Sequence, residues 1–263
     1  MIGYIGDFLV EDGVVKRYIG VGGELVIPEG VKEIGDSAFI NCAAVTSAEL
    51  PEGIEIIRTA AFSWRTGLLR VKLPHSLRII EEGAFEGCSS LAAVEIPEGV
   101  REIHVAAFHG CQQLESIRIP LSLEIYEDFI EENCSTAIIA PGRALADILD
   151  MYKIHAAHGF ALRAARGEQI AEDVRREYVE FIKLHEEKLC NRAMKSRALL
   201  QFLMSEELVD AARLEKMLSQ AIESNDFELT ASLLDYQGRL LTAEKRLQRM
   251  QQQENELSEL WEF

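Results

Sequence analysis

Hydrophobic positions follow two different spacings along this chain. Up to about residue 140 they recur every 23 residues, and after about residue 155 they follow the three- and four-residue spacing of helices. A fixed period of 23 residues predicts a solenoid, because one coil buries its apolar face only by stacking on the next coil. The columns of one residue type are Ile34, Ile57, Ile80 and Ile103; Phe39, Phe62, Phe85 and Phe108; and Pro28, Pro51, Pro74, Pro97 and Pro120.

Each repeat predicts one strand and one return segment. In the repeat that ends at Pro97, Val94 and Ile96 share one strand face, while Glu95 between them points the other way. Pro97 ends the strand, since it has no N–H to give to the ladder. Residues 81–88 return the chain, and Phe85 within them is expected to fill the interior.

The repeat motif resembles that of the BspA-like leucine-rich repeat family of bacteria. The signature is clearest in residues 27–31 (IPEGV) and 36–42 (DSAFINC), and Leu91, Val94 and Ile96 have leucine-rich-repeat spacing. The resemblance covers about residues 1–155, including a cap near the N-terminus and a short exit helix that ends at Tyr152. It implies a leucine-rich-repeat solenoid and a non-enzymatic binding protein, which in many family members lies on the cell surface.

Residues after about 155 predict an all-α region. The apolar residues of 170–182 form one stripe of an amphipathic helix. Further helices are expected near 192–204, 207–223 and 227–236, with a turn and helix N-cap at residues 224–226. The predicted fold class is therefore α+β. A leucine-rich-repeat solenoid domain at residues 1–155 precedes an all-α helical domain at residues 156–263, which ends in a long amphipathic helix.

The last predicted helix carries a short heptad seam. Positions 240, 243, 247, 250, 254, 257 and 261 alternate spacings of three and four residues, and Glu254 interrupts the apolar run. The seam predicts a possible homodimer, with four candidate self-association residues: Leu247, Met250, Leu257 and Trp261. The alternative is a terminal helix that packs on its own helical domain.

One repeat departs from the columns. Residues 63–66 (SWRT) stand where the next two repeats have EGCS and HGCQ. Trp64 and Arg65 are candidate partner-binding residues, because exposed aromatic and arginine side chains are enriched in interface hot spots. In the alternative interpretation, Trp64 folds over the edge of the coil and covers apolar surface. The last repeat also decays, since Phe129 is out of register.

The outward strand positions predict a ladder of alternating charge. Glu49, Lys72, Glu95 and Arg118 follow one another at 23-residue steps, and adjacent strands would place them about 4.8 Å apart. Such pairs contribute about 0.2–1 kcal/mol each and help to fix the order of the repeats. The same face is also a polar surface for a protein or peptide. Its candidate contacts are Arg70, from a neighbouring row, with Lys72, Glu95 and Arg118.

Cysteine and histidine follow the repeat rather than a catalytic pattern. Cys42, Cys88, Cys111 and Cys134 share one inward column, so we expect reduced structural thiols. The sequence holds no C-x-x-C, H-E-x-x-H or G-x-S-x-G motif. It therefore predicts no catalytic residue, no metal site and no cofactor.

Charge narrows the classes of partner. The chain has 27 Lys and Arg against 44 Asp and Glu, a formal net charge of −17, which argues against nucleic acid and anionic membrane surfaces. No apolar run suits membrane insertion, and no signal peptide is visible, so we expect a cytoplasmic location, or the cell surface if a signal was removed.

The predicted function is a non-catalytic protein–protein interaction module. It would bind a protein or peptide through the strand face and the adjoining loops. One alternative is a scaffold or regulatory subunit of an enzyme, with a ligand at the junction near His155 and His158. The other is a surface adhesin.

Overall fold

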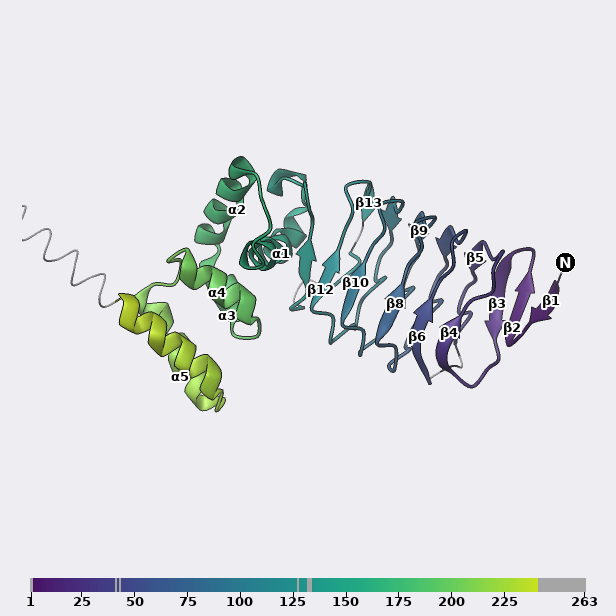
Figure 1. Cartoon of the computed structure of the whole chain (residues 1–263), viewed down its shortest axis with the longest axis horizontal. Helices are drawn as coiled ribbons and strands as arrows, with labels where there is room; N and C mark the ends of the chain where they lie inside the picture. The colour runs from purple at the N-terminus through teal and green to yellow at the C-terminus, as the bar shows by residue number, and fades with distance from the viewer. Residues whose placement is uncertain (1, 41, 43, 127, 132–133, 241–263) are drawn as a thin grey trace, which may run out of the picture. The chain divides into compact units, whose positions relative to one another are not determined.

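The structure is a computed structural model that describes residues 2–40, 42, 44–126, 128–131 and 134–240 (Figure 1). It divides into two compact units. The first holds the chain up to Arg163 together with residues 170–178, and the second holds residues 164–169 and the chain from Val179 onward. The predicted fold class is confirmed, because a solenoid of parallel strands is followed by helices.

An eight-stranded sheet runs along one side of the solenoid. It begins with an antiparallel meander of β1 (Ile2–Ile5), β2 (Phe8–Glu11) and β3 (Val14–Tyr18). Five two-residue parallel strands then follow at 23-residue steps, one from each coil. These strands are β5 (Glu33–Ile34), β7 (Ile56–Ile57), β9 (Ile79–Ile80), β11 (Glu102–Ile103) and β13 (Ile125–Tyr126).

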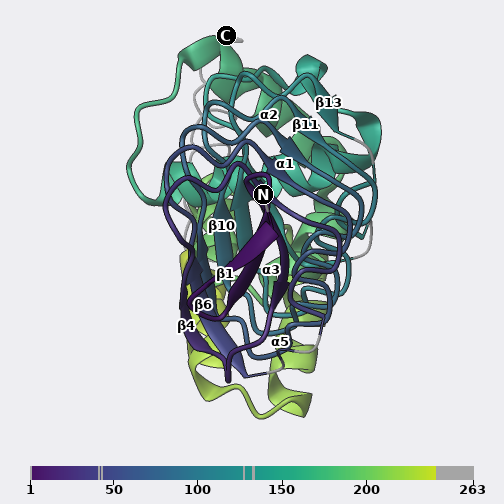
Figure 2. The same ribbon diagram turned by 90° about the vertical axis from the view of Figure 1, so that its right-hand side faces the viewer.

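The other side of the solenoid carries two separate three-stranded parallel sheets. The first consists of β4 (Gly23–Val26), β6 (Val45–Glu49) and β8 (Arg70–Lys72). The second consists of β10 (Ala93–Glu95), β12 (Ser116–Arg118) and β14 (Ala137–Ile139). Viewed along the stack, β4, β6 and β10 lie on the side opposite β11 and β13 (Figure 2).

A column of aromatic rings fills the interior between the two sides. The ring centroids of Phe39 and Phe62 lie 4.5 Å apart, and those of Phe62, Phe85 and Phe108 follow at 5.2 Å, all stacked. Phe129 continues the column with an edge contact on Phe108 at 6.5 Å. It is out of register in the sequence because its coil is two residues shorter, as the pairing of Arg118 with Ile139 also indicates.

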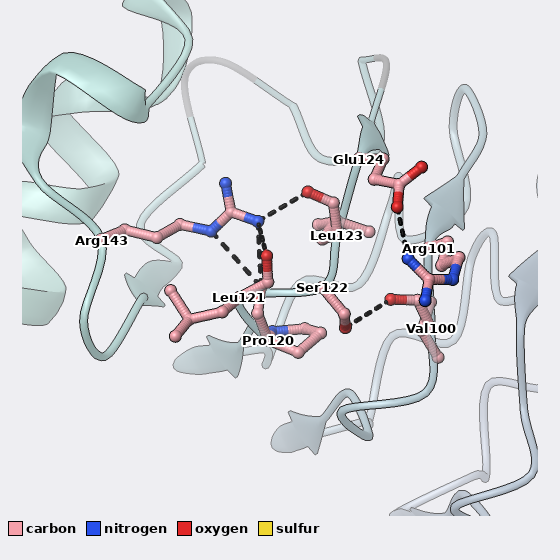
Figure 3. A network of polar contacts seen from close by, with 8 residues as sticks. All are labelled: Val100, Arg101, Pro120, Leu121, Ser122, Leu123, Glu124 and Arg143. Atoms are coloured by element: carbon pink, nitrogen blue, oxygen red, sulfur yellow. Dashed lines mark hydrogen bonds and ion pairs between the residues drawn. The ribbon is translucent and has the colours of Figure 1, made fainter.

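The end of the solenoid is closed by short helices and by one arginine. The expected short helix consists of two 3₁₀ turns, Leu145–Asp147 and Asp150–Tyr152. It runs directly into α1 (Lys153–Ala165), a helix that was not predicted from the sequence. Gly159 allows α1 to lie on β14, since a Cβ there would be 1.9 Å from the Ile138 oxygen. Arg143 ties down the last corner through hydrogen bonds to three backbone carbonyl oxygens, of Pro120, Leu121 and Leu123 (Figure 3).

The remaining chain is helical. α2 (Glu172–Leu184) crosses the boundary between the units, and α3 (Glu186–Ala193), α4 (Arg197–Ser205), α5 (Ala211–Glu223) and a helix over 227–240 follow. The single helix expected near 192–204 is wrong in its bounds, because Ser196 caps a new helix by accepting from the Leu199 N–H.

The helix N-cap expected at residues 224–226 is confirmed. Asp226 accepts a hydrogen bond from the Leu229 N–H at 3.0 Å. None of the helices in the described residues is long and apolar enough to cross a membrane. The candidate self-association residues lie outside the described residues: Leu247, Met250, Leu257 and Trp261.

Candidate functional site

Arg65 is buried, whereas the hot-spot hypothesis required an exposed arginine. Only 6% of Arg65 is exposed. Its guanidinium donates to the carbonyl oxygens of Ser63 and Ile40, both at 3.0 Å. Arg65 occupies the inward column of Cys88 and Cys111, one repeat earlier, and this position explains its burial. The expectation of an exposed Trp64–Arg65 pair is therefore corrected: Arg65 ties neighbouring coils together from inside.

Trp64 remains on the surface, in a strained backbone conformation. It is 61% exposed, and its φ of 59° lies in the left-handed region. The equivalent residues of the next two coils are Gly87 and Gly110, with φ of 68° and 70°. A left-handed conformation costs a residue with a Cβ about 1–2 kcal/mol, whereas glycine adopts it freely. The backbone at this corner therefore suits glycine, and tryptophan is held there at a local cost.

Two cysteines of the inward column, Cys88 and Cys111, have a structural role. The thiols of Cys88 and Cys111 donate to the carbonyl oxygens of Phe62 and Phe85, each at 3.2 Å. Burial raises the pKa of Cys88 to about 12 and raises the pKa of Cys111 as well. Both groups are therefore neutral thiols at physiological pH, and a neutral buried thiol is a poor nucleophile.

The charged ladder forms as two ion pairs. Lys72 Nζ lies 2.5 Å from Glu49 Oε1, and this hydrogen bond, with the charge of Glu49, raises the pKa of Lys72. Arg118 Nε lies 3.6 Å from Glu95 Oε1. Arg70 belongs to the next row, where its guanidinium is 4.0 Å from Glu24. The predicted neighbours therefore lie on one face, with one pair on β6 and β8 and the other on β10 and β12.

The hydrogen-bonded ladder is interrupted between these two pairs. Leu50 donates its N–H to the Lys72 carbonyl of the next coil at 3.1 Å. Ile96 donates in the same way to Arg118 at 2.9 Å. Leu73 has the equivalent position in its own coil, but within the described residues its N–H has no such bond, and β8 and β10 belong to different sheets. We call this place the open junction: the facing edges of β8 and β10.

An open pocket of about 380 Å³ lies over the open junction. Its polar lining is Lys72, His75, Glu95, Glu98 and Arg118. The apolar lining includes Leu73, Ile96 and Ile119, which are themselves largely buried. The pocket thus combines charges of both signs with an apolar floor, a composition that suits recognition rather than covalent chemistry.

The loop that carries His75 is held by the preceding coil. The Glu52 carboxylate accepts the backbone N–H groups of His75 and Ser76 at 3.0 and 3.1 Å. These bonds, that of His75 first, lower the pKa of Glu52. The rim of the pocket is therefore positioned before any partner arrives.

The structure brings three of the six candidate residues together at the pocket: Lys72, Glu95 and Arg118. Sequence reasoning missed His75 and Glu98, which follow the strand-ending prolines of two successive coils. Their signal was available, because corner residues of adjacent coils lie beside the strand ends. The opening itself has no sequence signal, since the repeats on both sides keep the same spacing.

The histidines of the alternative site are not open to a ligand. His155 and His158 are 1% and 3% exposed. The Nδ1–H of His155 donates to the Thr136 carbonyl oxygen at 2.6 Å. His155 thus packs within the closed end of the solenoid. Among the described residues, no group of three or more His, Cys, Asp or Glu could hold a metal ion.

Comparison with known proteins places the repeats in a family. A model of the BspA type leucine-rich repeat region matches six copies over residues 23–138. No curated protein matches the chain.

Solved structures with similar repeats come from several bacteria. The T. pallidum leucine-rich repeat protein TpLRR is 30% identical, with 48% of this chain and 60% of that one covered and a TM-score of 0.42. A leucine-rich cell surface protein of Faecalibacterium prausnitzii is 28% identical, covering 54% of this chain and 40% of that one, with a TM-score of 0.48. The chain thus spans 60% or less of these proteins' lengths. Residues 23–138 belong to the BspA-type leucine-rich repeat family.

Proposed function

We propose that the chain is a non-catalytic protein-interaction module that binds a protein or peptide over the open junction. The observation that supports this function is the interrupted ladder between β8 and β10, covered by a pocket of about 380 Å³. The repeat family is consistent with an interaction module. In this proposal, Lys72, Glu95 and Arg118 contact the partner.

The chemistry of the pocket favours a partner with both charge signs and an extended backbone. Lys72 and Glu95 are exposed at its rim, where each ion pair with a partner contributes only about 0–1 kcal/mol. The apolar floor and the unbonded Leu73 N–H offer the remaining affinity, since a buried donor gains from a partner carbonyl. A peptide main chain supplies such a carbonyl together with apolar side chains.

Location and oligomeric state belong to the same proposal. A cytoplasmic location is supported by the buried free thiols of Cys42, Cys88 and Cys111. The homodimer through the C-terminal helix stays a prediction. Sedimentation of the full chain and of a chain that ends at Leu241 tests it: a lower mass for the shorter chain supports the dimer, and an unchanged oligomeric state excludes it.

The proposed binding site is tested with peptides selected against the full chain. Peptides from a random display library are measured by calorimetry against the unmodified protein and against Lys72→Ala, Glu95→Ala and Arg118→Ala. We expect each variant to weaken binding about twofold to fivefold, because each removes one exposed charged contact at the rim.

Arg101→Ala is the matched control. Arg101 is also exposed and forms an ion pair with Glu124 of the next coil (Figure 3). It does not line the pocket. We expect this variant to bind the peptides as the unmodified protein does. Equal affinity for all four variants would contradict the open junction as the binding site.

A further inference from the structure

The return segments carry a second surface, distinct from the open junction. Trp64 lies there, and its indole covers the next coil: a Cβ added to Gly87 would lie 2.6 Å from the indole Cδ2 and Cε3 atoms. The backbone N–H of Trp64 donates to the Glu86 carbonyl oxygen at 2.5 Å, which places the two residues side by side on adjacent coils. Trp64 as a whole residue is 61% exposed. Covering Gly87 therefore uses only part of this large side chain.

Acidic residues outnumber Lys and Arg on the described return segments, and Glu86 lies beside Trp64 on the next coil. The acidic residues are Asp36, Glu81, Glu82, Glu86, Asp128 and Glu131. The cations on the same segments are already engaged. Arg58 lies 2.5 Å from the Glu33 carboxylate, and Arg65 is buried on backbone carbonyls. His104 and His109 lie 3.2 and 3.5 Å from Glu102 and Asp128. The return segments that carry the exposed Trp64 thus have a net negative charge.

We propose that Trp64 and the acidic return segments form an interaction surface for a basic protein partner, with an arginine side chain stacked on the indole. A cation placed over an indole ring is attracted by the ring electrons, and nearby carboxylates strengthen the attraction. Arginine fits better than lysine, because its planar guanidinium stacks on a ring while donating hydrogen bonds at its edge.

The surface is independent of the proposed function at the open junction. Trp64 does not line the pocket there, and the pocket residues belong to strands and corners rather than to return segments. Variants of one surface therefore leave the other unchanged. The failure of one proposal can therefore be distinguished from the failure of the other.

The test uses the full chain with Trp261→Phe, which leaves Trp64 as its single tryptophan. The probe is the acetylated and amidated peptide Gly-Arg-Gly-Arg-Gly, titrated at low salt while Trp64 fluorescence is recorded. We expect a saturable change in Trp64 emission, and binding about fivefold weaker for the lysine version of the peptide.

Trp64→Gly separates this surface from general charge attraction. We expect it to weaken the arginine peptide about tenfold in calorimetry, and we expect Glu86→Gln to weaken it about threefold. Because glycine adopts the left-handed backbone of this position freely, as in the next two coils, Trp64→Gly should keep the melting temperature of the unmodified chain or raise it.

The control is Glu115→Gln, which removes an exposed carboxylate directly before β12. It should leave the affinity of the arginine peptide unchanged, as should Lys72→Ala. If Trp64→Gly binds the arginine peptide as tightly as the unmodified chain, the peptide only follows the net charge of −17, and the proposed surface is wrong.

Discussion

Two successive junctions between coils have the same interior packing but differ in whether the strands of the three-stranded sheets pair. At the regular junction, β10 and β12 pair in register from Ala93 with Ser116 to Glu95 with Arg118. At the open junction, β8 and β10 do not pair. Yet the Phe62–Phe85 and Phe85–Phe108 rings are stacked at the same distance, 5.2 Å, with interplanar angles of 5° and 6°.

The difference indicates that the stacking of the coils does not depend on the ladder of the three-stranded sheets, since the aromatic column and the eight-stranded sheet continue through both junctions. The interior is constant where the ladder is present and where it is absent. Since nearest-neighbour interfaces stabilise a solenoid, one strand edge can open without separating the coils. A repeat protein can therefore expose backbone groups and a pocket at one junction while its core stays continuous.

Phe85→Ala removes the aromatic ring that belongs to both junctions. Phe85 is fully buried and stacks on a ring in each neighbouring coil. We expect a loss of about 3–5 kcal/mol in the free energy of urea unfolding. Leu69→Ala is the control, because Leu69 is 53% exposed, and it should change the free energy by less than about 0.5 kcal/mol. Similar values for the two variants would contradict the role of the column.

Gly87→Ala tests the packing of the return segments at the open junction. The new Cβ meets the Trp64 indole at 2.6 Å, and φ is 68°. We expect a destabilisation of about 2 kcal/mol and a shifted Trp64 emission.

Gly30→Ala has the same kind of backbone strain in open space, with φ of 83° and nothing within 4 Å of the added Cβ. It should cost about 1 kcal/mol. A cost for Gly87→Ala no greater than that for Gly30→Ala would show that the indole does not press on Gly87.

The thiol column adds a smaller, pH-dependent term to both junctions. Burial raises the pKa of Cys88 to about 12 in the folded chain, from an ordinary value of 9.0. Above pH 9 the unfolded chain loses this proton and the folded chain keeps it, so stability falls as pH rises. Between pH 8 and pH 10 we expect Cys88 to account for a loss of about 1.4 kcal/mol. Urea unfolding of Cys88→Ala at the two pH values should show a loss smaller by that amount; an identical pH dependence would refute it.

The sequence predicted the solenoid because its columns repeat without interruption. The phenylalanine, isoleucine and proline columns each report one fixed place in the coil, and even the displaced Phe129 rejoins its column. The burial of Arg65 also follows from its place in the cysteine column, although the exposed-pair hypothesis overlooked it.

The open junction was not predictable in this way. The step from Lys72 to Glu95 is the same 23 residues as the step from Glu49 to Lys72. Whether two strand edges pair depends on small backbone displacements that residue types alone do not encode. Trp64 was visible as a departure, but its cover over Gly87 and its left-handed backbone required the structure.

Amide hydrogen exchange at Leu73 tests the open junction most directly. Leu50 and Ile96 hold the same place in neighbouring coils and donate their N–H groups to the next strand, whereas Leu73 has no such bond. By NMR of the full chain, the Leu73 amide should exchange at least about tenfold faster than the amides of Leu50 and Ile96. Equal protection of the three amides would mean that β8 and β10 are paired in solution and that the junction is closed.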